Sequence, residues 1–91
     1  MQKILIADDE AKIRRIIRDF LTAKGFETVE AEDGAQALRV FSENSDIALA
    51  VLDIMMPEMN GWEVCRKIRE TSDIPVIFLT ARGEEFDELE C

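Results

Sequence analysis

Three aspartates stand directly after apolar runs of the sequence. Asp8 and Asp9 follow the run ILIA at residues 4–7, and Asp53 follows the run IALAVL at residues 47–52. A carboxylate next to a buried strand is expected at the strand's end, because burying its charge without a partner is costly. Where parallel strands end side by side, their last residues meet at the edge at which open α/β sheets bind ligands. We therefore predict one acidic site at one sheet edge.

Such a site favours metal-dependent phosphoryl chemistry. Close carboxylates repel one another unless one is protonated or a cation offsets the charge. Carboxylate, carbonyl and water oxygens are ligands that suit Mg²⁺. A magnesium ion beside Asp53 would draw in a phosphoryl group, and an aspartate can accept phosphate as an acyl phosphate. Thr80 follows the apolar run at residues 76–79, so its hydroxyl could donate to a phosphoryl oxygen.

Each of these residues also has an ordinary structural explanation. Asp9 could cap the helix that follows it, and Thr80 could be a simple strand-end residue. Asp53 could be a cap or turn residue, although Pro57 places the next helix later in the chain. Four such residues at three strand ends of one sheet favour a functional site over these alternatives.

The apolar periodicity predicts strands that alternate with helices. The expected strands span residues 3–7, 26–31, 47–52 and 76–79. The expected helices span residues 10–24, 34–44 and 61–70, and a further one begins near residue 84. Helical crossovers make neighbouring strands parallel and require helices on both faces of the sheet. We predict a doubly wound, flavodoxin-like α/β fold with strand order 2-1-3-4, its switch point lying between the first and third strands.

Polar and glycine residues mark the helix ends. Gly25 is expected just after the first helix, while Asp33 and Asn60 are expected to cap the second and third. The apolar positions of the first helix predict a buried stripe made of Ile13, Ile16, Ile17, Phe20 and Leu21. The corresponding stripe of the third helix consists of Val64, Cys65 and Ile68.

Composition narrows the function classes. The 91 residues are enough for one small domain, and the net charge is −9 without any histidine. So acidic a surface repels phosphate backbones, which argues against direct nucleic-acid contact by this segment. No apolar stretch approaches the roughly 20 residues that cross a bilayer, and no signal peptide is evident at the N-terminus. We expect a cytoplasmic protein without membrane contact.

Three segments carry a family resemblance. The sequences ILIADDE at residues 4–10, VLDIMMPEMNG at residues 51–61 and PVIFLTA at residues 75–81 resemble receiver domains of bacterial two-component response regulators. The chain is most similar to the receivers that precede winged-helix DNA-binding domains. The resemblance extends over essentially the whole chain and implies a role in phosphorelay and transcription regulation.

The resemblance also implies residue roles. Asp53 would be the phosphoacceptor, taking phosphate from a sensor histidine kinase. Mg²⁺ would be held by Asp9, Asp53 and the main-chain carbonyl of Met55, with Asp8 acting mostly through bound water. Thr80 would contact the phosphoryl group and couple it to the fourth strand.

The sequence departs from the family after its fourth strand. No segment corresponds to the family's fifth strand and helix, or to the lysine that pairs with the phosphate there. We therefore expect residues 1–91 to form a truncated receiver domain that is impaired in switching. The strand at residues 76–79 would be an open, apolar sheet edge, which predicts self-association of the chain as a dimer.

The residues argue against two other functions. A Mg²⁺-dependent phosphatase resembling the haloacid dehalogenases needs a second aspartate two residues after the nucleophile, where this chain has Met55. A flavodoxin needs a phosphate-cradling loop at the place occupied by residues 8–10, whose acids would repel phosphate. We thus expect no enzyme. An engineered or folding-study fragment that self-associates without signalling activity is the alternative.

Overall fold

The computed structural model describes residues 2–79, which form seven elements of secondary structure. In chain order they are β1 (Lys3–Ala7), α1 (Ala11–Ala23), β2 (Glu27–Ala31), α2 (Gly34–Glu43), β3 (Ile47–Asp53), α3 (Gly61–Arg69) and β4 (Val76–Leu79). The expected contribution of Thr80 and the helix expected from residue 84 lie outside the described residues.

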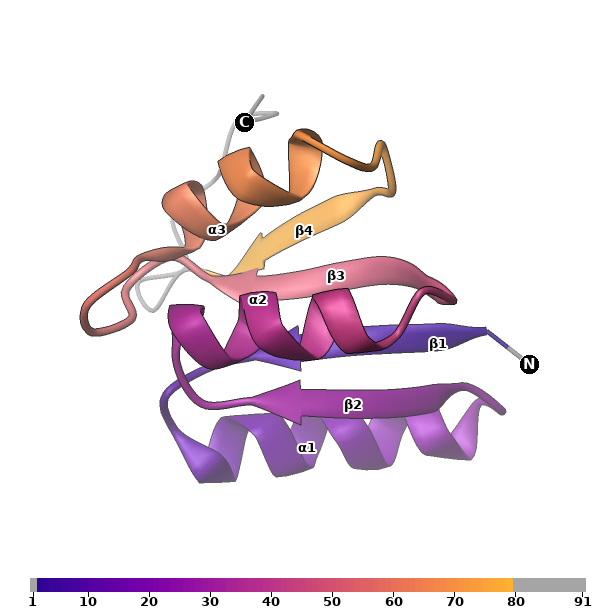
Figure 1. The fold of residues 1–91 in the computed structure, drawn as a ribbon. Coiled ribbons are helices and arrows are strands. Elements are labelled where there is room, and N and C mark those ends of the chain that lie inside the picture. The colour runs from indigo at the N-terminus through magenta and orange to yellow at the C-terminus, as the bar shows by residue number, and fades with distance from the viewer. Residues whose placement is uncertain (1, 80–91) are drawn as a thin grey trace.

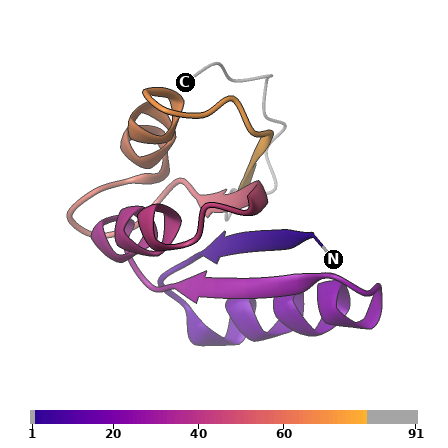
Figure 2. The ribbon, with the colours of Figure 1, turned by 45° about the vertical axis from the view of Figure 1, so that its right-hand side comes forward.

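The four strands form one parallel sheet in the order β2-β1-β3-β4, as predicted. Figure 1 shows their arrowheads pointing the same way, so all four carboxyl ends lie along one edge. Helix α1 covers one face, and α2 and α3 lie on the other, which is clearest in Figure 2. The fold class is therefore confirmed, with β1 and β3 as neighbours at the centre of the sheet.

Two apolar clusters hold the layers together. The larger lies under α2 and α3 and includes Leu5, Leu52, Val64, Cys65 and Ile68, all fully buried. The smaller lies under α1, where Ile17 and Leu21 pack against Ile4, Ile6 and Val51. Because successive strand residues face opposite sides, β1 and β3 contribute to both clusters. The predicted stripe of α3 is thus confirmed.

The predicted helix ends are confirmed. The Asp33 carboxylate accepts a 2.7 Å hydrogen bond from the amide of Gln36 at the start of α2. Asn60 and Glu63 exchange reciprocal 3.0 Å side-chain to backbone bonds, which make a capping box for α3. Gly25 follows α1 with a φ of +94°, a conformation that side chains with a Cβ rarely adopt.

The buried stripe predicted for α1 is partly wrong. Ile17 and Leu21 pack against the sheet, whereas Ile16 and Phe20 are each 61% exposed. A helix that lies flat on a sheet buries a narrower arc than five apolar positions span. Within residues 2–79, α1 packs chiefly on β1 and β2, so the flank that carries Ile16 and Phe20 faces outward.

Strand β4 is an edge of the sheet in the described part of the chain. It pairs with β3 from Val76 opposite Ala50 to Leu79 opposite Asp53, and Ile77 is 45% exposed. Self-association through this strand is untested by the fold and stays a prediction. Between residues 2 and 79, the helices are too short or too polar to span a bilayer.

Candidate functional site

The strand register brings the acidic residues together. Ala7 of β1 pairs with Leu52 of β3, so the next residues, Asp8 and Asp53, lie at the same level of neighbouring strands. One carboxylate oxygen from each of Asp8, Asp9 and Asp53 lies within 4.8 Å of the other two. Asp8 and Asp53 are only 4% and 9% exposed, whereas Asp9 is open to solvent. The predicted convergence of the three aspartates is confirmed.

Backbone amides fix the two buried carboxylates. Oδ1 of Asp8 accepts a 2.9 Å hydrogen bond from the amide of Glu10. Oδ1 of Asp53 accepts a 3.1 Å bond from the amide of Met55. Both are local turns in which a side chain bonds its own backbone two residues on. Each carboxylate is therefore oriented by the loop that follows its strand.

Neither Asp9 nor Asp53 caps a helix. The N-cap position of α1 is held by Glu10, whose side chain makes no capping bond, so Asp9 is not the cap of this helix. The cap of α3 is Asn60, which leaves Asp53 outside that role. The turn that Asp53 makes with Met55 orients its carboxylate and does not use up both of its oxygens.

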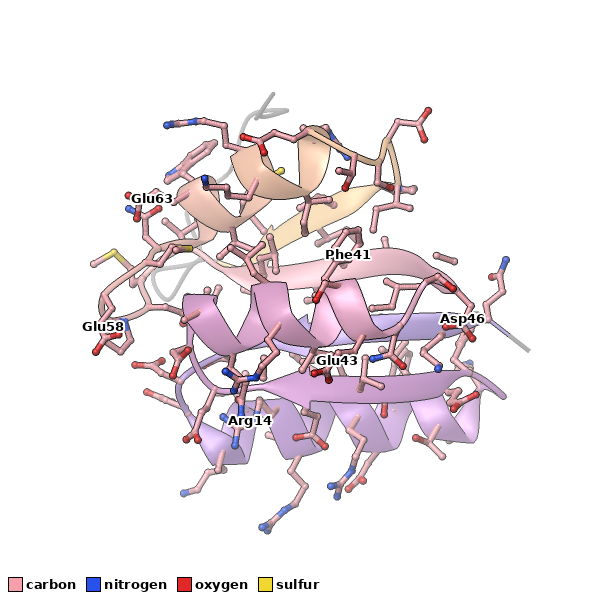
Figure 3. All side chains as sticks on the ribbon, viewed as in Figure 1. Arg14, Phe41, Glu43, Asp46, Glu58 and Glu63 are labelled. Carbon is pink, nitrogen blue, oxygen red and sulfur yellow. The ribbon has the colours of Figure 1, made fainter. Side chains whose placement is uncertain are left out.

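The loop after β3 is held tightly against the end of that strand. The amide of Gly61 donates a 3.0 Å hydrogen bond to the carbonyl of Ile54. A Cβ at Gly61 would lie 2.5 Å from the carbonyl oxygen of Asp53, closer than any side chain tolerates. At the loop's tip, Glu58 adopts a φ of +69°. Figure 3 shows Glu58 at the end of the molecule to which the strands point.

Burial and like charge act together on the acidic cluster. Burial is the main cause that raises the pKa of Asp53 to about 6, and Asp8 and Asp9 raise it further, while the Met55 amide opposes the shift. Burial likewise raises the pKa of Asp8, opposed by the Glu10 amide and aided by Asp9 and Glu10. The site therefore stores unfavourable electrostatic energy at neutral pH, which a bound cation would relieve.

A cavity of about 630 Å³ opens beside the cluster. It is lined by Asp9, Ile54, Met55, Met56, Pro57, Asn60 and Trp62. Trp62 belongs to α3, and its ring lies 4.8 Å from that of Phe78 on β4, centroid to centroid. Sequence reasoning placed neither Trp62 nor Asn60 beside the site. The adjacent Gly61 was the available signal, since a glycine that opens a helix often marks a close backbone approach.

The donor set fits a hard divalent cation. Oxygen is the only donor that Asp8, Asp9 and Asp53 offer, and three carboxylates exceed what protonation of one can neutralise near pH 7. Asp9, the exposed member, gives an entering ion access from solvent. The contribution predicted for the Met55 carbonyl stays a prediction, as does the contact predicted for Thr80, which lies outside the described residues.

Comparison with protein families gives one match that spans nearly all of the sequence. Residues 4–91 match the response regulator receiver domain. Among curated proteins, a probable transcriptional regulator, ycf27 of Pyropia yezoensis, is 48% identical over 88 residues, covering 97% of this chain. Those residues make up 36% of that regulator, so the chain spans about a third of its relative's length.

Two solved structures resemble the fold and bear on the site. The response regulator TrrA of Thermotoga maritima, in complex with Mg²⁺ and BeF, superimposes with a TM-score of 0.83 at 40% identity, covering 89% of this chain and 70% of that one. The complex of the histidine kinase ThkA with TrrA gives a TM-score of 0.86 at 37% identity, covering 98% and 77%.

Proposed function

The chain belongs to the response regulator receiver domain family, and we propose that it accepts a phosphoryl group on Asp53 from a sensor histidine kinase, with Mg²⁺ bound at Asp8, Asp9 and Asp53. The observation that carries the proposal is the cluster of three carboxylate oxygens within 4.8 Å at the ends of β1 and β3. Asp53 is the last residue of β3, whereas Asp8 and Asp9 follow the end of β1.

The roles of the residues follow from their positions. Asp9 and Asp53 would hold the ion directly, together with the Met55 carbonyl, and Asp8 would act mostly through water. The bound ion would supply positive charge that lets an anionic donor approach three carboxylates. Oδ1 of Asp53 accepts a hydrogen bond from the Met55 amide, so Oδ2 is the freer of its two oxygens and would be the attacking one. The new bond joins this oxygen to phosphorus, and the bond that breaks joins phosphorus to the donor's leaving atom.

The wider role proposed is two-component signalling. Curated relatives are named as transcriptional regulators, and a structural neighbour is a regulator bound to its histidine kinase. We place the chain in the cytoplasm as a phosphoprotein that is not itself an enzyme acting on substrates. Its net charge of −9 supports an output that does not run through direct contact of this segment with nucleic acid. Thr80 would contact the phosphoryl group once formed.

Incubation with a small acyl-phosphate donor and Mg²⁺ tests the proposal. Intact mass spectrometry should show the addition of one phosphoryl group, and peptide mapping should place it on Asp53. Asp53→Asn should take up none, and Asp73→Asn, which alters an exposed acid on the loop before β4, should behave as the wild type. A wild-type chain that binds Mg²⁺ but gains no phosphoryl group would overturn phosphoacceptance and favour a chain without signalling activity.

A further inference from the structure

Arg14 connects three elements at the base of the acidic cluster. It lies in the first turns of α1, and Figure 3 shows it toward the carboxyl ends of the strands, far from Asp46 at the other end of the sheet. Its Nε donates a 3.2 Å hydrogen bond to Oε1 of Glu30 on β2. Its Nη1 donates to the main-chain carbonyl of Asp8, the residue that follows β1. Its side chain is only 16% exposed.

The bond to Asp8 acts on the backbone of the site. The carbonyl of Asp8 and the amide of Asp9 belong to one planar peptide unit, so fixing that oxygen fixes the plane. The orientation of this plane sets ψ of Asp8 and φ of Asp9, and thereby the direction in which the Asp9 side chain leaves the loop. Among the described residues, no other side chain donates a hydrogen bond to the Asp8 carbonyl.

The amide and the carboxylate of Asp8 are held by hydrogen bonds that do not involve the Arg14 side chain. Its amide donates a 3.1 Å hydrogen bond to the carbonyl of Ala31 at the end of β2, and its carboxylate accepts from Glu10. The amide of Arg14 in turn donates to the carbonyl of Glu10. The loop from Asp8 to Glu10 is thus held at both ends, and the Arg14 side chain holds the peptide unit between Asp8 and Asp9.

We propose that Arg14 is a positioning residue for the metal site: by holding the Asp8 carbonyl while Glu30 holds its guanidinium, it presets Asp9 as a ligand. The inference rests on the proposed binding of Mg²⁺ at Asp8, Asp9 and Asp53. Arg14 touches neither the ion nor the reacting atoms, so it acts on affinity for the ion through the backbone. Supporting groups of this kind typically change metal affinity by about 10- to 100-fold.

A guanidinium suits this role better than an ammonium would. Arg14 uses two different nitrogens, one for Glu30 and one for the Asp8 carbonyl, in the fixed geometry of a planar fork. A lysine keeps the charge but offers one donor atom on a flexible stem. A lysine at this position would therefore still attract Glu30, but it would no longer hold the peptide plane between Asp8 and Asp9 in place.

Arg18 provides a matched control. It bonds the same Glu30, through Oε2 at 3.4 Å, and also Asp19, but it makes no bond to the loop. Arg18→Gln removes the same charge from the same helix and leaves the Asp8 carbonyl held. A purely structural contribution of the Glu30 ion pairs would affect both arginines, whereas positioning of Asp9 concerns Arg14 alone.

The test is a Mg²⁺ titration of the full chain followed by Trp62 fluorescence, since Trp62 lines the cavity beside Asp9. Arg14→Gln should raise the Mg²⁺ concentration for half-saturation about tenfold, and Arg14→Lys at least about threefold. Arg18→Gln should match the wild type. With the acyl-phosphate donor, the rate at saturating Mg²⁺ should stay within about twofold of the wild type for all three variants.

Each outcome decides between positioning and its alternatives. Equal half-saturation in Arg14→Lys and the wild type overturns positioning, as does an equal rise in Arg14→Gln and Arg18→Gln. Should Arg14→Gln fail to fold, Arg14→Lys still decides. A wild-type chain that shows no saturable response to Mg²⁺ overturns the proposed function instead, and thus the two failures are distinguishable.

Discussion

The amide of Met55 donates a 3.1 Å hydrogen bond to Oδ1 of Asp53, two residues before it. The bond opposes the rise in the pKa of Asp53 that burial and the neighbouring acids produce. Met55 also lines the cavity beside the cluster, with its side chain largely exposed. The loop after β3 therefore does two things: it stabilises the charged form of the proposed phosphoacceptor and it shapes the approach to it.

Removing the charge of Asp53 should stabilise the apo protein at neutral pH. The pKa of Asp53 is raised from 3.8 to about 6, so the folded state binds a proton more readily than the unfolded state between these values. This residue's contribution to the free energy of unfolding is therefore most favourable below about pH 4 and falls as pH rises to 6. Asp53→Asn has no carboxyl group to ionise, so it does not lose this contribution to the free energy of unfolding. The loss in the wild type is on the order of 2–3 kcal/mol at pH 7.5.

Thermal unfolding of Asp53→Asn and the wild type at a series of pH values measures this difference. The variant should have the higher midpoint at pH 7.5, and the two curves should converge by about pH 4. Asp73→Asn controls for the general effect of removing one acid from a chain of net charge −9. A difference that stays constant from pH 4 to 7.5 would show that the charge of Asp53 is not what destabilises the fold.

Magnesium should stabilise the folded chain, and more so above pH 6 than below it. A ligand present at 100 times its Kd adds about 2.7 kcal/mol to the free energy of unfolding. Protons compete with the ion for Asp53, whose pKa is about 6, so the gain should fade as the pH drops toward 5. Asp9→Asn should lose most of the gain at pH 7.5, because Asp9 is the exposed member of the cluster and a proposed ligand of the ion.

Thermal shift with and without MgCl₂ checks this prediction, with NaCl added to equal ionic strength. The salt control is needed because any cation screens the repulsion in an acidic protein. An equal rise in midpoint for the wild type and Asp9→Asn would contradict a specific site at the strand ends.

The fold was largely predictable because its signals are local and strong. The apolar runs and the caps Asp33 and Asn60 are legible in sequence, and a parallel sheet places strand ends along one edge whatever the details. That is why the convergence of Asp8, Asp9 and Asp53 could be predicted from the sequence alone. The resemblance to receiver domains then supplied the roles that geometry alone does not assign.

The features that the sequence could not predict depend on contacts between elements that are distant in the chain. Ile16 and Phe20 have the periodicity of buried residues, yet they are exposed because the described elements leave that flank of α1 uncovered. In the sequence, Arg14 resembles an ordinary surface charge. Only the register of β1 against β2 places Glu30 and the Asp8 carbonyl close enough for Arg14 to bond both. Both cases turn on tertiary contacts that no local pattern encodes.

Gly61 should be required for both stability and the metal site. In Gly61→Ala the new Cβ would meet the Asp53 carbonyl oxygen at 2.5 Å and the Ile54 Cα at 3.0 Å, so the backbone at the strand end has to move. Overpacking of this kind costs about 1–3 kcal/mol. The displaced backbone carries the Asp53 carboxylate, so affinity for Mg²⁺ should fall as well.

Gly25→Ala is the matched control. Gly25 has a φ of +94° with open space around its missing Cβ, so alanine there brings backbone strain of about 1–2 kcal/mol without a clash. Urea denaturation should show both variants destabilised, while Trp62 fluorescence titration should show weaker Mg²⁺ binding for Gly61→Ala only. Unchanged affinity in Gly61→Ala would mean that the site tolerates movement of its strand end.

Self-association through β4 is the prediction with the most direct readout. In the part of the chain that the structure describes, β4 pairs only with β3, and Ile77 is 45% exposed on it. An apolar edge strand offers free backbone groups to another copy, and a lysine on such an edge discourages pairing.

Size-exclusion chromatography with light scattering should show the wild type associating at micromolar concentration and Ile77→Lys as a monomer. Ile16→Lys places the same charge at a more exposed isoleucine on α1, 61% against 45%, and should leave association intact. A monomeric wild type would refute the prediction, and loss of association in Ile16→Lys alone would move the interface to α1.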